Sequence, residues 1–140
     1  MKVTFTIQGR PKGKERPRMN RGTGAVYTPR GTNTYEQAVA WKYRETAKGG
    51  SFGEKPVKVQ ITAYFKIPKS FSLYKKEQAA RGEITPTVKP DTDNIIKIIL
   101  DSLNGVAYRD DKQVIEVRCQ KQYGTEEQVT VTIEEEKDHE

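Results

Sequence analysis

Apolar and polar residues alternate along four segments of the chain, and this pattern predicts strands. The first lies at residues 2–8, the clearest at residues 57–65, and two more are expected at residues 115–120 and 129–133. A period of two places every second side chain on one face, which is typical of a strand with one buried face. The alternating apolar residues are Val3, Phe5, Ile7, Val57, Val59, Ile61, Ala63, Phe65, Ile115, Val117, Cys119, Val129, Val131 and Ile133.

Helical spacing predicts three helices, at residues 34–48, 72–81 and 91–103. Thr34 and Gln37 have the spacing of a capping box, which predicts the start of the first helix. Its expected inner face consists of Val39, Trp41, Tyr43 and Ala47. The third helix has a broad apolar face of Ile95, Ile96, Ile98, Ile99, Leu100 and Leu103. Asn104-Gly105 is expected to end it, with Gly105 in a left-handed conformation.

The order strand, helix, strand, helix, helix, strand, strand indicates an α+β fold. This order is expected for a mixed β-sheet that packs against about three helices. A chain of 140 residues fits one domain with its own small core, so residues 1–140 are expected to form a single unit. Residues 134–140 are rich in acids and are expected to form a frayed tail.

Positive charge is concentrated in one Gly-rich stretch. Residues 10–30 hold seven basic residues against one acid, a net charge of +6 that equals the net charge of the whole chain. We expect residues 10–32 to form a flexible basic arm that contacts DNA phosphates, although a solvated loop without a partner has the same composition. The expected DNA-binding residues are Lys12, Lys14, Arg16, Arg18, Arg21, Arg30 and, further along the chain, Lys89.

Several classes of protein are excluded by composition. No apolar run is long enough for a membrane span or a signal peptide. Cys119 is the single cysteine and His139 the single histidine, so neither an internal disulfide nor a zinc site of Cys/His type is expected. These features indicate a cytoplasmic protein with no membrane partner.

Two acids stand at the predicted start of the third helix. On a helical wheel Asp93, Asn94, Lys97 and Asp101 share the narrow face opposite the apolar one. Asp91 lies at the entry to the helix. An ordinary explanation is that Asp91 is an N-cap and that Asp93, Lys97 and Asp101 form an exposed ladder of ion pairs.

A second acidic pair, Asp110-Asp111, follows the helix after a short turn. If the chain doubles back beside the helix, three or four carboxylates come together, and their mutual repulsion favours a bound cation. Hard oxygen ligands suit Mg²⁺ or Mn²⁺, which assist phosphodiester cleavage in nucleases. Taken alone, Asp110 and Asp111 are equally consistent with a polar turn.

Together these segments resemble the signature of the RusA family of Holliday-junction resolvases. The family pattern has a KPDxDN start, a lysine on the helix and a DD-x-Q-V ending, and the matching positions span residues 89–114. The segments are Lys89-Pro90-Asp91-Thr92-Asp93-Asn94-Ile95-Ile96-Lys97, Leu100-Asp101-Ser102-Leu103-Asn104-Gly105 and Tyr108-Arg109-Asp110-Asp111-Lys112-Gln113-Val114.

The resemblance implies a homodimer that binds four-way DNA junctions and makes paired nicks with Mg²⁺, for which Mn²⁺ can substitute. It also implies that Asp91, Asp93 and Asp111 are the essential acids and metal ligands and that Lys97 is the essential lysine. Asp110 is a secondary candidate, since a one-residue shift in the alignment would exchange it with Asp111. Two other functions account for the same residues: a metal-dependent DNA nuclease without junction preference, and a non-catalytic DNA-binding module.

Overall fold

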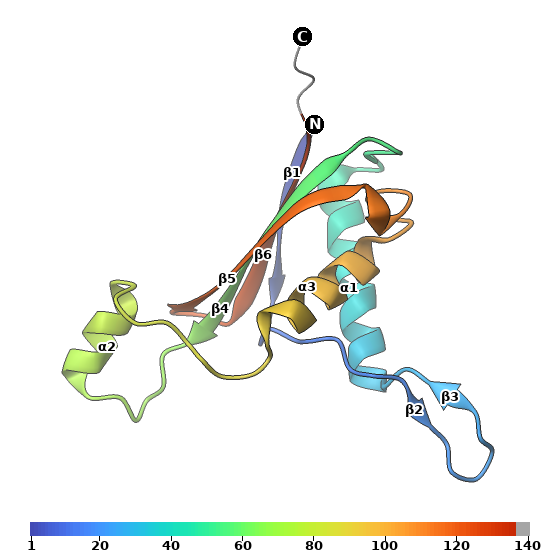
Figure 1. Ribbon diagram of the computed structural model, residues 1–140. Coiled ribbons are helices and arrows are strands. Elements are labelled where there is room, and N and C mark those ends of the chain that lie inside the picture. Colours follow the sequence, from blue (N-terminus) through green and yellow to red (C-terminus); the bar gives the residue numbers. More distant parts are fainter. Residues whose placement is uncertain (137–140) are drawn as a thin grey trace.

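The protein is described by a computed structural model that covers residues 1–136 (Figure 1). Its elements, in chain order, are β1 (Lys2–Gln8), β2 (Arg18–Met19), β3 (Val26–Tyr27), α1 (Arg30–Ala47), β4 (Val57–Lys66), α2 (Leu73–Ala80), α3 (Thr92–Leu103), the short 3-10 helix η1 (Asp111–Gln113), β5 (Val114–Gly124) and β6 (Gln128–Glu135).

The main sheet has four strands in the order β1-β6-β4-β5. β6 pairs antiparallel with both β1 and β4, whereas β4 and β5 run parallel. A parallel pair needs a long crossover, and α2 and α3 lie within it. The expected α+β fold with a mixed sheet and three α-helices is therefore confirmed.

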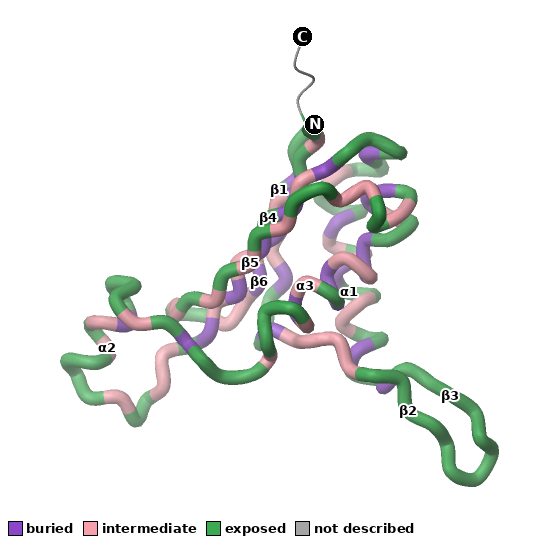
Figure 2. The backbone as a smooth tube through the Cα atoms, in the orientation of Figure 1, coloured by how far each residue is buried: buried purple, intermediate pink, exposed green. Residues whose placement is uncertain are grey.

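α1 and α3 pack against one face of the sheet and each other (Figure 1). On β4 the odd-numbered residues are buried beneath these helices and the even-numbered ones are not, which is the alternation that the sequence predicts. Figure 2 shows the buried residues gathered between the helices and the sheet. The opposite face of the sheet carries polar side chains and no helix covers it within residues 1–136.

α3 is the most deeply embedded helix. Ile95, Ile98, Ile99 and Leu103 are at most 1% exposed. The helix ends as expected, because Gly105 has φ +75°, a conformation that strains other residues. The apolar face of α3 is thus fixed against the core, so the polar residues on the opposite edge of the helix point in a defined direction.

Two expectations about α1 are wrong. The helix begins at Arg30 after Pro29, and Thr34 lies inside it, donating a hydrogen bond to the carbonyl oxygen of Arg30 at 2.9 Å. Trp41 is 67% exposed rather than internal. Successive helical residues turn by about 100°, so Trp41 points about 200° away from the buried Val39.

Two segments project from this body in opposite directions (Figure 1). Residues 16–28, which we call the hairpin, form the two-stranded pair β2–β3 and are exposed throughout. Residues 66–89, which we call the lobe, leave the end of β4, form α2 and return to α3. The sequence predicted α2 within two residues but not the strands of the hairpin, which are two residues each.

The expectation of a frayed tail from residue 134 is wrong for its first two residues. Glu134 and Glu135 belong to β6, and Glu135 forms ion pairs with the amino terminus at 2.6 Å and with Lys55 at 3.1 Å. The rest of that acidic segment, residues 137–140, lies outside the described residues. Between residues 1 and 136, none of the helices has both the length and the apolar character that a membrane crossing requires.

Candidate functional site

The start of α3 presents two carboxylates that are not engaged by other side chains in the described residues. Asp91 occupies the N-cap position, but its side chain makes no capping hydrogen bond. Asp93 lies in the first turn, and both residues are exposed. Neither carboxylate takes part in an ion pair within residues 1–136. The capping explanation for Asp91 therefore fails, and both acids are available to a ligand at the positive end of the helix dipole.

A groove of about 670 Å³ runs beside these acids. One wall is residues 10–15, which we call the strap, and the other contains Lys89, Pro90, Asp91 and Asn94. The backbone N–H of Lys14 donates to the carbonyl oxygen of Asn94 at 3.0 Å. A Cβ on Gly13 would lie 2.8 Å from Cβ of Pro90, so glycine permits this close approach of the strap to α3.

Lys14 links the strap to the polar edge of α3. Its ammonium lies 2.8 Å from Glu36 of α1 and 3.3 Å from Asp101 of α3. Burial lowers the pKa of Lys14, but the hydrogen bonds and charges of Glu36 and Asp101 outweigh burial, so the pKa lies above its ordinary value. Lys14 is therefore a cation that holds the strap in place, with its ammonium shared between two carboxylates.

Lys97 lies on the same edge of α3, with its ammonium 3.9 Å from Asp101. Its side chain is 62% exposed, so the pairing leaves it accessible. Half of the expected ion-pair ladder is thus present, while Asp93 pairs with no lysine in the described part of the chain. Asp101 was noticed in the sequence for its helical spacing but was not chosen as a site residue, and Glu36 carried no signal.

The two acids after α3 have different roles. The carboxylate of Asp110 accepts a hydrogen bond from the backbone N–H of Lys112 at 2.9 Å and caps η1. That hydrogen bond is the main reason why the pKa of Asp110 lies below its ordinary value. Asp111 is exposed and caps nothing. Desolvation raises the pKa of Asp111, the Asp110 side chain raises it further through a hydrogen bond and its charge, the charge of Asp101 adds to this, and Lys97 lowers it.

These contacts locate the expected acids along one edge of α3. Asp91 and Asp93 stand at its start, whereas Asp111 lies within electrostatic reach of Asp101 and Lys97. Asp93 and Asp101 are eight residues apart, a rise of about 12 Å. Within residues 1–136 no three His, Cys, Asp or Glu side chains are close enough to hold a metal ion among themselves.

The donor chemistry nevertheless fits Mg²⁺. This ion commonly binds one or two carboxylates and completes its shell with water and substrate phosphates. Asp91 and Asp93 offer such a pair of hard oxygen donors, both accessible and without a competing cation in the described residues. DNA phosphates would supply the remaining ligands. The arrangement therefore suits a metal that binds together with its substrate better than a closed protein cage.

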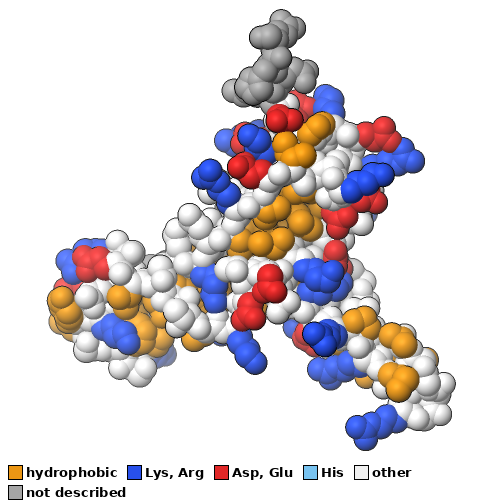
Figure 3. Space-filling view, in the orientation of Figure 1, with side chains coloured by type: hydrophobic (Ala, Val, Ile, Leu, Met, Phe, Trp, Pro, Cys, Tyr) orange, Lys and Arg blue, Asp and Glu red, His pale blue; other side chains and the backbone are white. Residues whose placement is uncertain are grey.

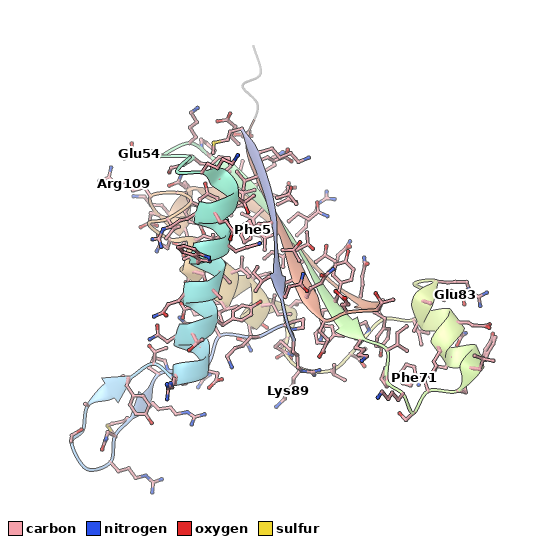
Figure 4. The ribbon with its side chains drawn as sticks, turned by 180° about the vertical axis from the view of Figure 1, so that it is seen from behind. Phe5, Glu54, Phe71, Glu83, Lys89 and Arg109 are labelled. Carbon is pink, nitrogen blue, oxygen red and sulfur yellow. The ribbon has the colours of Figure 1, made fainter. Side chains whose placement is uncertain are left out.

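The other expected DNA-binding residues surround the groove. Lys12 and Lys89 line it, and Lys12 also pairs with Glu15 at 2.9 Å. Figure 4 places Lys89 between the two projections, pointing away from the body. The hairpin carries Arg16, Arg18 and Arg21, and Arg30 begins α1. All four of these arginines are exposed.

Comparison with known proteins gives two findings. Residues 8–134 match the family model described as endodeoxyribonuclease RusA. A Bacillus subtilis (strain 168) protein, described as uncharacterized protein YqaN, is 37% identical over 141 residues, covering 95% of this chain and 96% of its own length. The family match includes both the strap and the whole polar edge of α3.

Proposed function

Because the chain belongs to the RusA family of endodeoxyribonucleases, we propose that it is a Holliday-junction resolvase. It acts as a homodimer that makes paired, Mg²⁺-dependent nicks in four-way DNA junctions during recombination and repair in the cytoplasm. One observation carries the proposal: at the start of α3, Asp91 and Asp93 present carboxylates with no capping or ion-pair role in the described residues, beside a groove walled by the basic strap.

DNA binding is supported by the charge around this groove. Lys12 and Lys89 stand on its two walls, and the hairpin adds three arginines. Each phosphate that such a residue neutralises releases counterions, which favours binding at moderate salt. The groove is wide and open, as a polymeric substrate requires, and it passes directly beside Asp91.

Asp91, Asp93 and Asp111 are the residues that would hold Mg²⁺ together with DNA phosphates. When bound, the ion would act as a Lewis acid, which polarises the phosphodiester and lowers the pKa of the water bound to it. Hydrolysis adds water across the P–O3′ bond and leaves a 5′ phosphate and a 3′ hydroxyl.

Lys97 has a separate role in this proposal. Its ammonium projects from the same edge of α3 and is steadied by Asp101 at 3.9 Å. A cation in this position neutralises a phosphate oxygen as negative charge accumulates in the transition state. The described residues contain no histidine to act as a general base, so proton removal from water would fall to a carboxylate.

The test is incubation with four-way, three-way and linear duplex DNA at limiting enzyme, with Mg²⁺ or with EDTA. We expect cutting of the four-way junction in Mg²⁺ alone. Equal cutting of junction and linear duplex would indicate a nuclease without junction preference. Full activity in EDTA would contradict the metal site. Binding without any cutting in Mg²⁺ or Mn²⁺ would indicate a non-catalytic DNA-binding module.

A further inference from the structure

The positive charge of the chain is carried by its projections and not by its body. The hairpin, with three arginines and no acid, has a net charge of +3, and the lobe, with six basic residues against two acids, has +4. The whole chain has +6, so everything else has a net charge of −1. Figure 3 shows Lys and Arg side chains on both the lobe and the hairpin.

Most of the lobe's charge is not neutralised within the chain. Of its basic residues only Arg81 forms an ion pair in the described part of the structure, with Glu83 at 3.2 Å. The other five are Lys66, Lys69, Lys75, Lys76 and Lys89. The strap differs, because Lys12 and Lys14 are both paired with glutamates. The lobe therefore offers cations to an external anionic partner.

The lobe is anchored at its base, so these cations are held in a defined place. The Phe71 ring meets Tyr123 of β5 edge-on, with ring centroids 5.8 Å apart, and the Lys75 ammonium lies 4.1 Å from the Phe71 centroid. Ala79 of α2 is 1% exposed. Lys121 of β5 donates a hydrogen bond to the carbonyl oxygen of Val88, which ties the returning segment to the sheet.

A basic path connects the lobe with the strap. The guanidinium of Arg10, which also pairs with Glu127 at 3.0 Å, lies 5.5 Å from the Phe65 ring centroid, and the ammonium of Lys121 lies 5.3 Å from it. Lys89 follows at the root of the lobe, on the wall of the groove beside Asp91. The lobe and the hairpin project to opposite sides of this root in both Figure 1 and Figure 4.

We propose that the lobe is a second DNA-binding element, which holds the phosphate backbone on the side of Asp91 and Asp93 opposite to the hairpin. Lys69, Lys75 and Lys76 are its phosphate contacts. The proposal rests on the proposed function and deepens it: the hairpin and the lobe each bind one flank of the cut position. A duplex that lies across both projections passes over the start of α3.

The test compares two triple variants that remove the same charge at different places. The lobe variant is Lys69→Gln, Lys75→Gln and Lys76→Gln. The control is Lys2→Gln, Lys58→Gln and Arg118→Gln, whose side chains line the open face of the sheet. Junction affinity is measured against salt concentration by gel shift. The log–log slope should fall by about 2 to 3 units in the lobe variant, about 0.9 for each neutralised phosphate, and by less than about 1 in the control.

Replacement of the same three lobe lysines by arginine should keep the wild-type slope, because the charges remain. Equal decreases in the lobe variant and the control would overturn the proposal, since net charge alone would then explain the effect. A change in the oligomeric state of the lobe variant, measured by sedimentation, would also overturn the proposal. The lobe would then be a contact between copies of the chain. If wild type binds and cuts junctions while the lobe variant keeps the full slope, only the lobe proposal fails. Wild type that does not bind junctions overturns both.

Discussion

At the scale of single residues, substitution of Asp91 and Asp93 separates two explanations of the start of α3: a proposed metal site and an ordinary helix start. Asn is itself a good N-cap, so Asp91→Asn would be nearly silent if the residue only capped α3. An exposed ion-pair partner contributes only about 0.3–0.5 kcal/mol. A metal ligand behaves differently, because removing its charge removes much of the affinity for the ion.

We therefore expect Asp91→Asn, Asp93→Asn and Asp111→Asn each to slow junction cutting about 100-fold or more, equivalent to about 3 kcal/mol in the transition state. Junction binding should persist or tighten, since a negative group near phosphates is removed. Cutting, gel-shift binding and thermal melting are measured on the same samples. Asp110→Asn is the matched control, because Asn can still cap η1, and it should cut at nearly the wild-type rate. If Asp110→Asn abolishes cutting while Asp111→Asn cuts at the wild-type rate, then Asp110 is the metal ligand and Asp111 is not.

Tyr35 gives a residue-scale prediction about stability. Its hydroxyl is buried and has no hydrogen-bond partner within the described residues, and burial raises the pKa of Tyr35 from 10.0 to about 12. Tyr35→Phe removes an unsatisfied polar group, so the free energy of unfolding should stay the same or rise by about 1 kcal/mol near neutral pH.

The pH dependence follows from the direction of that shift. Below pH 10 the hydroxyl is protonated in both states. Between pH 10 and about 12 the unfolded chain loses the proton more readily than the folded protein, so stability falls as pH rises, by up to about 2–3 kcal/mol from this group. Tyr35→Phe should lose less stability over this range in urea titrations. An identical alkaline decrease in both proteins would contradict the assigned burial of the hydroxyl.

The sequence predicted candidate site residues but not their geometry. It singled out Asp91, Asp93 and Lys97 because the family motif matches these positions and helical periodicity gives Asp93 and Lys97 a shared edge. The sequence could not tell that Asp110 caps η1 while Asp111 stays free, because both carboxylates fit a turn. It also missed the pairing of Lys14 with Glu36, which depends on how the strap crosses α1 and α3.

At the scale of elements, the basic segment divides into two parts with different tasks. The strap is tied down by Lys14 and by the close approach of Gly13 to Pro90. The hairpin extends beyond it, and a two-stranded pair of this size is marginally stable by itself. Strand pairing this short leaves no periodic signal, so the sequence indicated an arm but not its strands.

The hairpin prediction concerns Arg16, Arg18 and Arg21. Their replacement by Gln should weaken junction binding and lower the log–log salt slope by about 0.9 for each phosphate that is no longer neutralised, up to about 2.7. The melting temperature should hardly change, since none of the three side chains is buried. Gel shifts at several salt concentrations measure the change in binding, and a thermal melt measures the change in stability. An unchanged slope would mean that the hairpin does not touch phosphates.

At the scale of the whole molecule, the fold separates a nearly neutral body from two positively charged projections. The order of strands and helices was predictable, because the core alternates regularly on β1, β4 and β6. The direction in which the hairpin and the lobe project was not predictable, since it depends on tertiary contacts such as Phe71 with Tyr123. That arrangement brings the acids of α3 between two basic elements.

The most direct measurement of the central claim uses a supercoiled plasmid with an inverted repeat that extrudes as a four-way cruciform. Paired nicks within one binding event convert it to linear DNA, whereas a single nick releases the supercoiling, reabsorbs the cruciform and leaves a nicked circle. We predict linear product in Mg²⁺, no product in EDTA, and no cutting of the same plasmid without the repeat. Nicked circles formed equally from both plasmids would contradict the assignment as a junction resolvase.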